Sequence, residues 1–378
     1  MKKEENDVKN GLPKGWQIKH WNDVLTIKNG KNQKLVSDID GKYPIYGSGG
    51  IMGFANDYLC NEGTTIVGRK GSINNPIYVE EKFWNVDTAF GICSGVKLNS
   101  KFLFYFCLNF DFSKLNKSTT LPSLTKTDLL QINIPLPPLN EQHRIVRKLD
   151  ELFLKIDNAI GLTKENLEHS KHFYASALNE MFDLKSKSWK EFSITEKFRL
   201  INGRAYNREE LLLKGKYKVI RIQNLNGGEN WYYSDLELDA DKYCNKNDLL
   251  YSWSGTPHSS FGAFIWKGEK SIYHYHTWKV EFLDKKIDLD FAYHLFSYVT
   301  EVAISQSHGG TGMMHITKGK MELLKIRMPD SIKQKEVANY LNQLSNKQEQ
   351  LVAHYSKQLK QLEGLKASLL DGAFKGEI

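Results

Sequence analysis

The chain has 378 residues, of which 40% are hydrophobic and 25% charged, so it is long enough for two domains with buried cores. Its 52 lysine and arginine residues exceed its 44 aspartate and glutamate residues, which gives a net charge of +8 and favours a polyanionic partner such as nucleic acid. Four scattered cysteines without a CxxC motif exclude a disulfide scaffold. Because we find neither a secretory leader nor an apolar run of the roughly 20 residues that span a bilayer, we expect a cytoplasmic protein without a membrane partner.

The chain contains an internal repeat. A shift of 192 positions aligns residues 124–182 with residues 316–374 without a gap. Identical pairs include Ile134 with Ile326, Gln142 with Gln334, and Ala175-Ser176 with Ala367-Ser368. A single offset over so long a stretch indicates a duplicated structural unit.

The upstream segments repeat more loosely, with insertions in the second copy. Asn29-Gly30-Lys31 corresponds to Asn202-Gly203-Arg204, and Arg69-Lys70-Gly71-Ser72 corresponds to Trp253-Ser254-Gly255-Thr256. Each copy therefore has a variable front part and a back part of constant register. Plain gene duplication accounts for the repeat, but not for divergence that is confined to the front parts.

The front parts, residues 12–140 and 184–332, are expected to be mixed domains of short strands and turns, after a polar tail at 1–11. Segments such as Thr64–Gly68 and Gly262–Trp266 place β-branched and aromatic residues between glycine, asparagine and aspartate, which is typical of short strands.

The back parts predict two long helices, over 141–183 and 333–378. Pro137-Pro138 is a helix breaker, and Asn140 after it is an N-cap candidate. Apolar residues then recur at spacings of three and four, and the stripe of the first copy shifts phase after Ile156, as in a stutter. The stripe of the second copy includes Val337, Leu341, Leu344, Leu351, Leu362, Leu365 and Leu369.

A long helix with one apolar stripe needs a partner, because burial of that stripe must offset the entropy of ordering the backbone. Each front domain precedes its helix and the chain has to return. We therefore expect the two helices to pair antiparallel, with one front domain at each end. The alternative is that each helix packs only on its own domain.

Catalytic motifs are missing from the sequence. There is no G-x4-G-K-[ST] loop, and Met52 occupies the third glycine position of a G-x-G-x-x-G motif in Gly47–Gly53. Asn74-Asn75-Pro76-Ile77 lacks the second proline and the aromatic residue of an amino-methyltransferase loop. His274-x-His276 has no cysteine or carboxylate set nearby that would complete a metal site. We therefore predict no catalytic residue and no metal site.

Glycine-rich polar loops are the candidate DNA contacts. They recur in both copies, at 47–50, 69–72 and 118–120 and again at 253–258 and 307–312. Glycine lets a backbone approach a ligand closely, lysine and arginine bind phosphates, and polar side chains read base edges. Solvated turns are the alternative interpretation. The candidate DNA-binding residues are Ser48, Gly49, Arg69, Lys70, Ser72, Thr119, Lys126, Arg204, Arg221, Gln223, Trp253, Ser254, Thr256, His258, Thr311 and Lys318.

Three segments carry a resemblance to a known family. They are Leu121-Pro122-Ser123-Leu124-Thr125-Lys126, the junction Ile134-Pro135-Leu136-Pro137-Pro138-Leu139 with Glu141-Gln142 after it, and the C-terminal Ala373-Phe374-Lys375-Gly376-Glu377-Ile378. The chain resembles, over nearly its whole length, the DNA-specificity subunit of type I restriction-modification enzymes.

The resemblance implies an α+β fold with a pseudo-two-fold arrangement. Two mixed α/β target-recognition domains, 12–140 and 184–332, would be separated by an antiparallel coiled coil of the spacer helices 141–183 and 333–378. Each domain would read one half of a bipartite site in double-stranded DNA.

The resemblance also implies partners. Two adenine methyltransferase subunits would dock on the helices and bind S-adenosylmethionine, and a separate restriction and translocase subunit would use ATP and Mg. The chain itself would bind no cofactor and would not be an enzyme. The residues implied in docking or spacing are Glu141, Gln142, Ile145, Leu149, Leu152, Gln334, Val337, Leu341 and Leu344.

The second junction, Pro329-Asp330-Ser331-Ile332-Lys333-Gln334, keeps only the proline and glutamine of the first. We therefore expect the second methyltransferase to use different contacts. Two other functions are kept as alternatives: a two-headed coiled-coil adaptor that binds protein or glycan, and a self-sufficient nuclease or methyltransferase.

Overall fold

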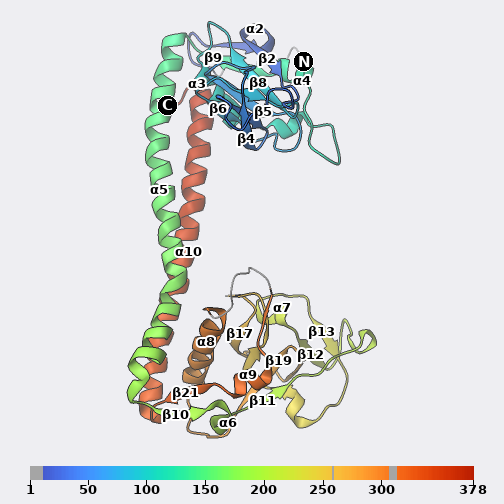
Figure 1. Ribbon diagram of the computed structural model, residues 1–378, viewed down its shortest axis with the longest axis vertical. Helices are drawn as coiled ribbons and strands as arrows, with labels where there is room; N and C mark the ends of the chain where they lie inside the picture. Colours follow the sequence, from blue (N-terminus) through green and yellow to red (C-terminus); the bar gives the residue numbers. More distant parts are fainter. Residues whose placement is uncertain (1–11, 258, 306–312) are drawn as a thin grey trace. The chain divides into compact units, whose positions relative to one another are not determined.

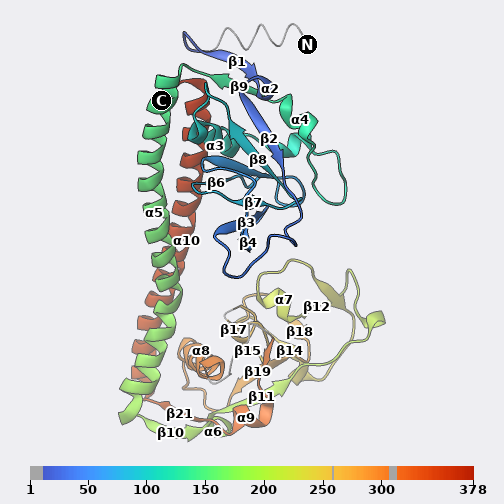
Figure 2. The ribbon, with the colours of Figure 1, turned by 45° about the horizontal axis from the view of Figure 1, so that its top comes forward.

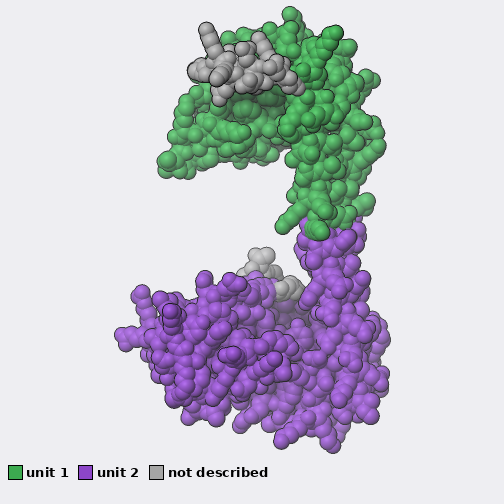
Figure 3. All heavy atoms as spheres, turned by 180° about the vertical axis from the view of Figure 1, so that it is seen from behind, with its two compact units in different colours: residues 1–164, 357–378 green, residues 165–356 purple. Residues whose placement is uncertain are grey.

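The computed structural model describes residues 12–257, 259–305 and 313–378, without the side chain of Leu184. These residues form two compact units, shown in green and purple in Figure 3. Unit 1 comprises the chain up to Lys164 together with Lys357–Ile378, and unit 2 comprises Glu165–Ser356. Each unit therefore holds one front domain and part of each long helix, α5 (Leu139–Asn179) and α10 (Ser331–Lys375).

The front domain of unit 1 is built on two antiparallel-rich sheets (Figure 1). A four-stranded sheet has the order β2-β8-β5-β6, a three-stranded sheet has the order β4-β3-β7, and β1 pairs with β9. The elements are β1 (Gln17–His20), α2 (Trp21–Val24), β2 (Leu25–Asn29), β3 (Tyr43–Gly47), β4 (Gly50–Ala55), β5 (Thr64–Gly68), β6 (Ile77–Val79), β7 (Trp84–Asn85), β8 (Ala89–Ser94), α3 (Ser100–Asn109), α4 (Lys126–Leu130) and β9 (Asn133–Leu136).

The front domain of unit 2 repeats this plan with more strands (Figure 2). The order β11-β19-β15-β17 matches that of the first four-stranded sheet, and β12 pairs in parallel with β18 as β3 does with β7. The elements are β10 (Lys190–Ser193), α6 (Ile194–Lys197), β11 (Phe198–Asn202), β12 (Tyr217–Ile220), α7 (Ile222–Leu225), β13 (Tyr232–Ser234), β14 (Tyr243–Cys244), β15 (Leu249–Ser252), β16 (Ser254–Gly255), β17 (Gly262–Ile265), β18 (Ser271–Tyr273), β19 (Thr277–Phe282), α8 (Leu289–Ser305), β20 (Met314–His315), α9 (Lys318–Glu322) and β21 (Lys325–Met328).

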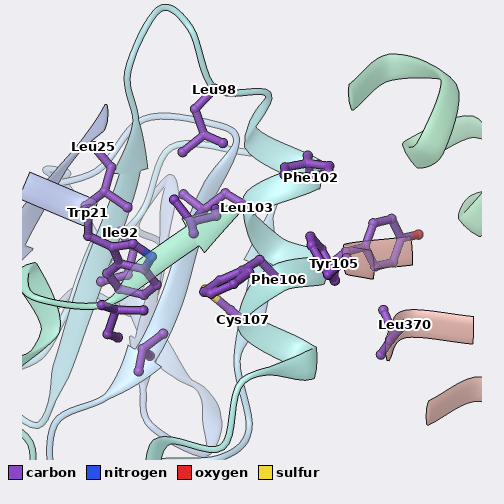
Figure 4. Close-up of a cluster of buried hydrophobic side chains, with 14 of the residues drawn as sticks. Trp21, Leu25, Ile92, Leu98, Phe102, Leu103, Tyr105, Phe106, Cys107 and Leu370 are labelled. Atoms are coloured by element: carbon purple, nitrogen blue, oxygen red, sulfur yellow. The ribbon is translucent and has the colours of Figure 1, made fainter. Parts of the chain in front are cut away.

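The core of unit 1 lies where α3 packs between the four-stranded sheet and the long helices (Figure 4). The Asn99 side chain caps α3 by accepting from the Lys101 and Phe102 backbone N–H groups. Trp21 is fully buried and meets Phe106 edge to face, with ring centroids 6.2 Å apart. One apolar cluster therefore joins the front domain to both helices.

Within each unit, the two long helices run antiparallel. In unit 1, the Lys366 ammonium lies 2.7 Å from an Asp157 carboxylate oxygen, and Arg144 donates to the Ile378 carbonyl. In unit 2, the Tyr174 backbone N–H donates to Oε1 of Gln348 at 2.7 Å. Early residues of α5 thus meet late residues of α10, and late residues of α5 meet early ones, as predicted.

Polar residues fill part of the buried stripe of α5. Thr163 and Ser170 are both buried, and their hydroxyls donate at 2.7 Å to the Ala159 and Asn166 carbonyls one turn earlier. These hydroxyls are satisfied within their own helix, so burial leaves no unpaired donor. The predicted phase shift after Ile156 falls at this change from large apolar to small polar residues.

A buried glutamine connects each front domain to the start of its long helix. The Gln142 side chain accepts from the Asn99 N–H at 2.7 Å and donates to the Lys97 and Pro137 carbonyls. In unit 2, Gln334 accepts from the Asp288 N–H at 3.0 Å and donates to the Pro329 carbonyl. The buried glutamine shared by both junctions therefore fixes the helix start by binding backbone groups of its front domain and of the junction.

A second pair of contacts keeps its geometry while its chemistry changes. In unit 1, Asp150 of α5 binds Lys101 at 2.9 Å and accepts from the Tyr105 hydroxyl of α3. At the corresponding places in unit 2, Asn342 donates to Asp290 at 2.9 Å and lies 2.9 Å from Nε2 of His294. Burial lowers the pKa of His294, so a neutral imidazole lies beside the neutral Asn342 amide.

We expect Gln142→Ala to lower the free energy of unfolding of unit 1 by about 2 kcal/mol, because the half-buried Asn99 N–H and two carbonyls lose their partner and a buried side chain is removed. Urea denaturation of the full chain measures the loss. Gln361→Ala, at an exposed position of α10, is the control and should stay within about 0.5 kcal/mol of wild type. Equal stability of the two variants would show that Gln142 does not anchor the helix.

Candidate nucleic-acid interface

Three loops of unit 1 meet at the end of β5. A Cβ added to Gly68 would lie 2.2 Å from the Ser72 carbonyl oxygen and 3.1 Å from Cβ of Ser48. The backbones of Lys70 and Ser123 form an isolated antiparallel β-bridge, and the Gly71 N–H donates to the Pro122 carbonyl at 3.0 Å. The structure thus brings together the β3–β4 turn, the 69–72 loop and the 118–123 loop, which hold Ser48, Gly49, Arg69, Lys70, Ser72 and Thr119.

Four loops of unit 2 meet in the corresponding place, around the turn His274–His276 between β18 and β19. The backbone of Arg204, after β11, forms an isolated parallel β-bridge with His274. The His274 N–H donates to the Ile220 carbonyl at the end of β12. The Trp253 N–H donates to the His276 carbonyl at 3.1 Å. The candidate residues Arg204, Arg221, Gln223, Trp253, Ser254 and Thr256 all belong to these loops or continue from them.

The same backbone bonds hold both loop clusters. In unit 1 the Arg69 N–H donates to the Thr88 carbonyl at 2.8 Å, and the Arg69 carbonyl accepts from Leu124 at 2.9 Å. In unit 2 the Trp253 N–H donates to His276, and the Trp253 carbonyl accepts from Ile316 at 2.9 Å. The sequence correspondence between Arg69 and Trp253 is therefore also a structural one.

Two glycines make this scaffold possible. A Cβ on Gly30 would lie 1.8 Å from the Val86 carbonyl oxygen, and one on Gly203 would lie 2.3 Å from that of His274. Both distances are far inside van der Waals contact, so only glycine fits at either position. The paired Asn-Gly motifs of the repeat are thus explained by close backbone approach.

The arginines of unit 2 already have partners. The Arg204 guanidinium binds both carboxylate oxygens of Glu210, at 2.9 and 2.6 Å, and lies over the Tyr206 ring. Arg221 donates to the Asn230 carbonyl at 3.1 Å and lies 4.2 Å from the centre of the Tyr232 ring. The Arg204 charge is therefore neutralised inside the unit, whereas Arg221 is held by a carbonyl oxygen and an aromatic face and keeps its charge.

The aromatic rings of the turn form a continuous surface with Trp253. The Tyr275 ring centre lies 3.9 Å from that of His276 and 6.3 Å from that of Trp253. Burial, followed by the charges of His276 and Arg221, lowers the pKa of His274 to about 4, and burial also lowers that of His276. Both imidazoles are neutral near pH 7.

No metal site accompanies these histidines. Within the described ranges, no group of three or more histidine, cysteine, aspartate or glutamate side chains could hold a metal ion. Two buried polar atoms near the turn, the Arg221 Nε and the Tyr206 hydroxyl, have no hydrogen-bond partner among the described residues. Such atoms are rare in folded proteins.

The remaining candidates lie at the edges of these clusters or outside the described residues. The Lys126 ammonium donates to the Ile27 carbonyl at 2.8 Å, and the Lys318 ammonium lies 3.6 Å from a Glu322 carboxylate oxygen. His258 and Thr311 lie outside the residues that the structure describes, as does the tail 1–11. As DNA contacts, all the candidates remain predictions.

Burial separates the two roles proposed for the helix residues. The side chains that pack into the core of their own unit are Gln142, Ile145, Leu149, Gln334, Val337 and Leu341, while Leu152 and Leu344 are half-buried and Glu141 pairs with Arg144 at 2.8 Å. The six buried residues are covered by the chain itself and hold the helices to the front domains. As docking or spacing residues, all nine remain predictions.

The chain matches the family model of the type I restriction modification DNA specificity domain twice, over residues 13–168 and 186–361. It belongs to this family. The predicted resemblance is therefore confirmed, and the two matches reproduce the two copies of the repeat.

Relatives are similar over most of their length. The chain is 25% identical to the MjaVIII specificity subunit of Methanocaldococcus jannaschii, over 97% of this chain and 94% of that protein. It is 20% identical to the EcoDI specificity subunit of Escherichia coli, over 97% and 89%.

Solved structures confirm the fold. A chain from a structural study of complex assembly and conformational transition in a type I R-M system has a TM-score of 0.80 at 18% identity, over 97% of this chain and 99% of that one. The HsdS subunit from Thermoanaerobacter tengcongensis has a TM-score of 0.61 at 18% identity, over 97% and 98%. The predicted class, two mixed domains with long helices, is thus confirmed. In the described part of the chain, no helix is both long and apolar enough to cross a membrane.

Sequence reasoning missed the turn at the centre of each cluster. His274-x-His276 was considered only as a metal site, and Val86–Thr88 was not singled out. The repeat contained a usable signal, because both turns follow their Asn-Gly motif and precede the strand that pairs with it. Without the pairing of β2 with β8 and of β11 with β19, their proximity to Arg69 and Trp253 could not be inferred.

We expect Arg204→Ala to destabilise unit 2 by about 1 kcal/mol, since it leaves the partly buried Glu210 carboxylate without its bidentate partner. A double-mutant cycle with Glu210→Ala in urea denaturation should give a coupling energy of similar size. Arg208→Ala, an exposed arginine of the same loop, is the control. A coupling energy near zero would show that the Arg204–Glu210 ion pair does not stabilise unit 2.

Proposed function

We propose that the chain is the DNA-specificity subunit of a type I restriction-modification complex, in which each front domain reads one half of a bipartite site in double-stranded DNA. The observation that carries this is the duplicated loop cluster, in which identical backbone bonds present different side chains. One scaffold can then meet two half-sites in equivalent ways, while different side chains give each half its own sequence.

The long helices would set the distance between the half-sites. Their antiparallel pairing within both units and the buried glutamines at both junctions favour a rigid spacer over a flexible linker. The spacer has no catalytic task, and we assign the reactions to the partners. A methyltransferase partner would bind S-adenosylmethionine and methylate adenine, and a restriction and translocase partner would use ATP and Mg.

The same helices would dock the two methyltransferase subunits through apolar side chains that this chain leaves uncovered. On the unit 1 part of α5, Leu154 and Leu162 are 64% and 62% exposed and lie eight residues apart, on one helix face. Phe173 of α5 and Leu365 of α10 occupy equivalent positions of the repeat, and both are exposed. An equivalent contact in each copy supports two docking sites.

A paired deletion tests the proposed function. The full chain is produced with the methyltransferase subunit of its own host, and methylated adenines are mapped across the genome. We expect one bipartite motif. Removing 161–167 from α5 and the facing 355–361 from α10 should shorten the gap between half-sites by about three base pairs, since seven helical residues span roughly 10 Å.

Seven residues preserve the phase of the apolar stripe, so both half-sites should stay unchanged. A matched seven-residue insertion at both places is the control and should lengthen the gap by a similar amount. Changed half-sites with an unchanged gap, or no methylated motif for the wild-type chain, would contradict the proposal.

A charge on the exposed helix face tests docking. We expect Leu162→Asp to reduce the methyltransferase recovered with the chain by about tenfold or more, because an apolar contact would have to bury a carboxylate. The stability of the chain alone should change by less than about 0.5 kcal/mol. Leu213→Asp, at a position that is 82% exposed in the front domain of unit 2, is the control. Full recovery with Leu162→Asp would place docking elsewhere.

A further inference from the structure

Two short turns occupy equivalent positions in the two units. Val86–Thr88 joins β7 to β8, and His274–His276 joins β18 to β19. Each turn closes on itself, because the Ala89 N–H donates to the Val86 carbonyl and the Thr277 N–H donates to the His274 carbonyl, both at 2.9 Å. The turns are therefore the same structural feature carrying different side chains.

The side chain that supports each turn also contacts it in the same way. The Arg69 guanidinium donates at 3.4 Å to the carbonyl of Asp87, the middle residue of the first turn. The Trp253 indole N–H donates at 2.7 Å to the carbonyl of Tyr275, the middle residue of the second. Each middle residue is held by its carbonyl, which leaves its side chain free to point outward.

Those two side chains are exposed and chemically different. Asp87 is exposed, and within the described ranges its carboxylate forms no hydrogen bond or ion pair. Tyr275 is 40% exposed and lies against the His276 ring. A free carboxylate is repelled by phosphate, and Tyr275 offers a phosphate a hydroxyl donor but no positive charge.

Both groups suit bases. A carboxylate accepts a hydrogen bond from the amino group of cytosine in the major groove, and an aromatic ring makes apolar contact with the methyl group of thymine there. The low pKa of the two flanking histidines leaves them neutral, as donors and acceptors for base edges. The nearby arginine charges are already engaged, by Glu210 for Arg204 and by the Tyr232 ring for Arg221.

We propose that the turns Val86–Thr88 and His274–His276 are the base-reading elements of the two domains, with Asp87 contacting a base of one half-site and Tyr275 contacting bases of the other. This inference rests on the proposed function and deepens it. It assigns sequence reading to these turns and leaves phosphate binding to exposed cations such as Lys70.

The test uses the full chain assembled with its methyltransferase subunit. The motif is read from methylated adenines, and binding is measured on a short duplex that carries the wild-type motif, over a series of salt concentrations. The variants are Asp87→Asn, Tyr275→Ala and Tyr275→Phe. The controls are Glu80→Gln, an exposed carboxylate of unit 1, and Leu213→Ala of unit 2.

Asp87→Asn should relax or change one half-site and Tyr275→Ala the other, and each should weaken binding to the wild-type duplex by roughly ten- to a hundredfold. The slope of log affinity against log salt should stay unchanged, whereas Lys70→Ala should reduce it by about one. Tyr275→Phe should keep the motif if the ring makes the contact, and should behave like the alanine variant if the hydroxyl does. Controls should match wild type.

Three results would overturn the inference. The first is that the wild-type chain and both variants, Asp87→Asn and Tyr275→Ala, all give the same methylated motif. The proposed function would then stand without this inference. The second is an unchanged motif with a reduced salt slope, which would make the turns phosphate contacts. The third is loss of the methyltransferase subunit from the variants, which would make the turns docking surfaces. Absence of any wild-type motif would instead remove the proposed function and this inference with it.

Discussion

A long helix with a single apolar stripe is stable only where that stripe is covered, and the organisation of both units follows from this constraint. In unit 1 the stripe of α5 begins in the core of its own front domain, where Ile145 and Leu149 are buried, and residues such as Leu370 of α10 join the same cluster. In unit 2 the roles are exchanged, because Val337 and Leu341 of α10 enter the core together with Leu178 of α5. Each helix therefore packs on a domain and on the other helix, so the alternative that each helix packs only on its own domain is wrong.

Backbone bonds, rather than side chains, define the loop clusters. The backbone bonds that hold Arg69 in unit 1 and Trp253 in unit 2 are the same although one side chain is a cation and the other a neutral indole. Glycines such as those at 30, 68 and 203 are sterically required, because a Cβ there would overlap a backbone carbonyl. A scaffold of this kind tolerates replacement of nearly every side chain at its surface, since a backbone N–H donates whatever side chain its residue carries. This is the physical condition for two domains of one origin to acquire different ligands.

The contacts between front domains and helices show the same tolerance in the interior. Lys101, Asp150 and Tyr105 form a charged network in unit 1, whereas the same places in unit 2 hold Asp290, Asn342 and His294. The front domain contributes a negative charge in place of a positive one, and the partner from the long helix has lost its charge. Hydrogen-bond geometry is retained while the formal charges change, so satisfaction of buried polar groups is the property held in common.

The sequence alone determined the repeat, the two long helices and their antiparallel pairing, because heptad spacing, proline breakers and a fixed offset are local or periodic signals. The family resemblance could also be stated from the junction and its neighbours. The shared glutamine was visible, but its burial beneath the domain was not, and it was assigned to docking or spacing instead.

Only the tertiary structure decided which side chains are free. Glu210 is six residues from Arg204, but nothing in that spacing showed a bidentate ion pair. The position of the Asp87 and Tyr275 turns in the loop clusters depends on the pairing of strands that are far apart in the sequence. Such facts depend on which segments meet in space, and the pairing of distant strands leaves no periodic trace in the order of residues.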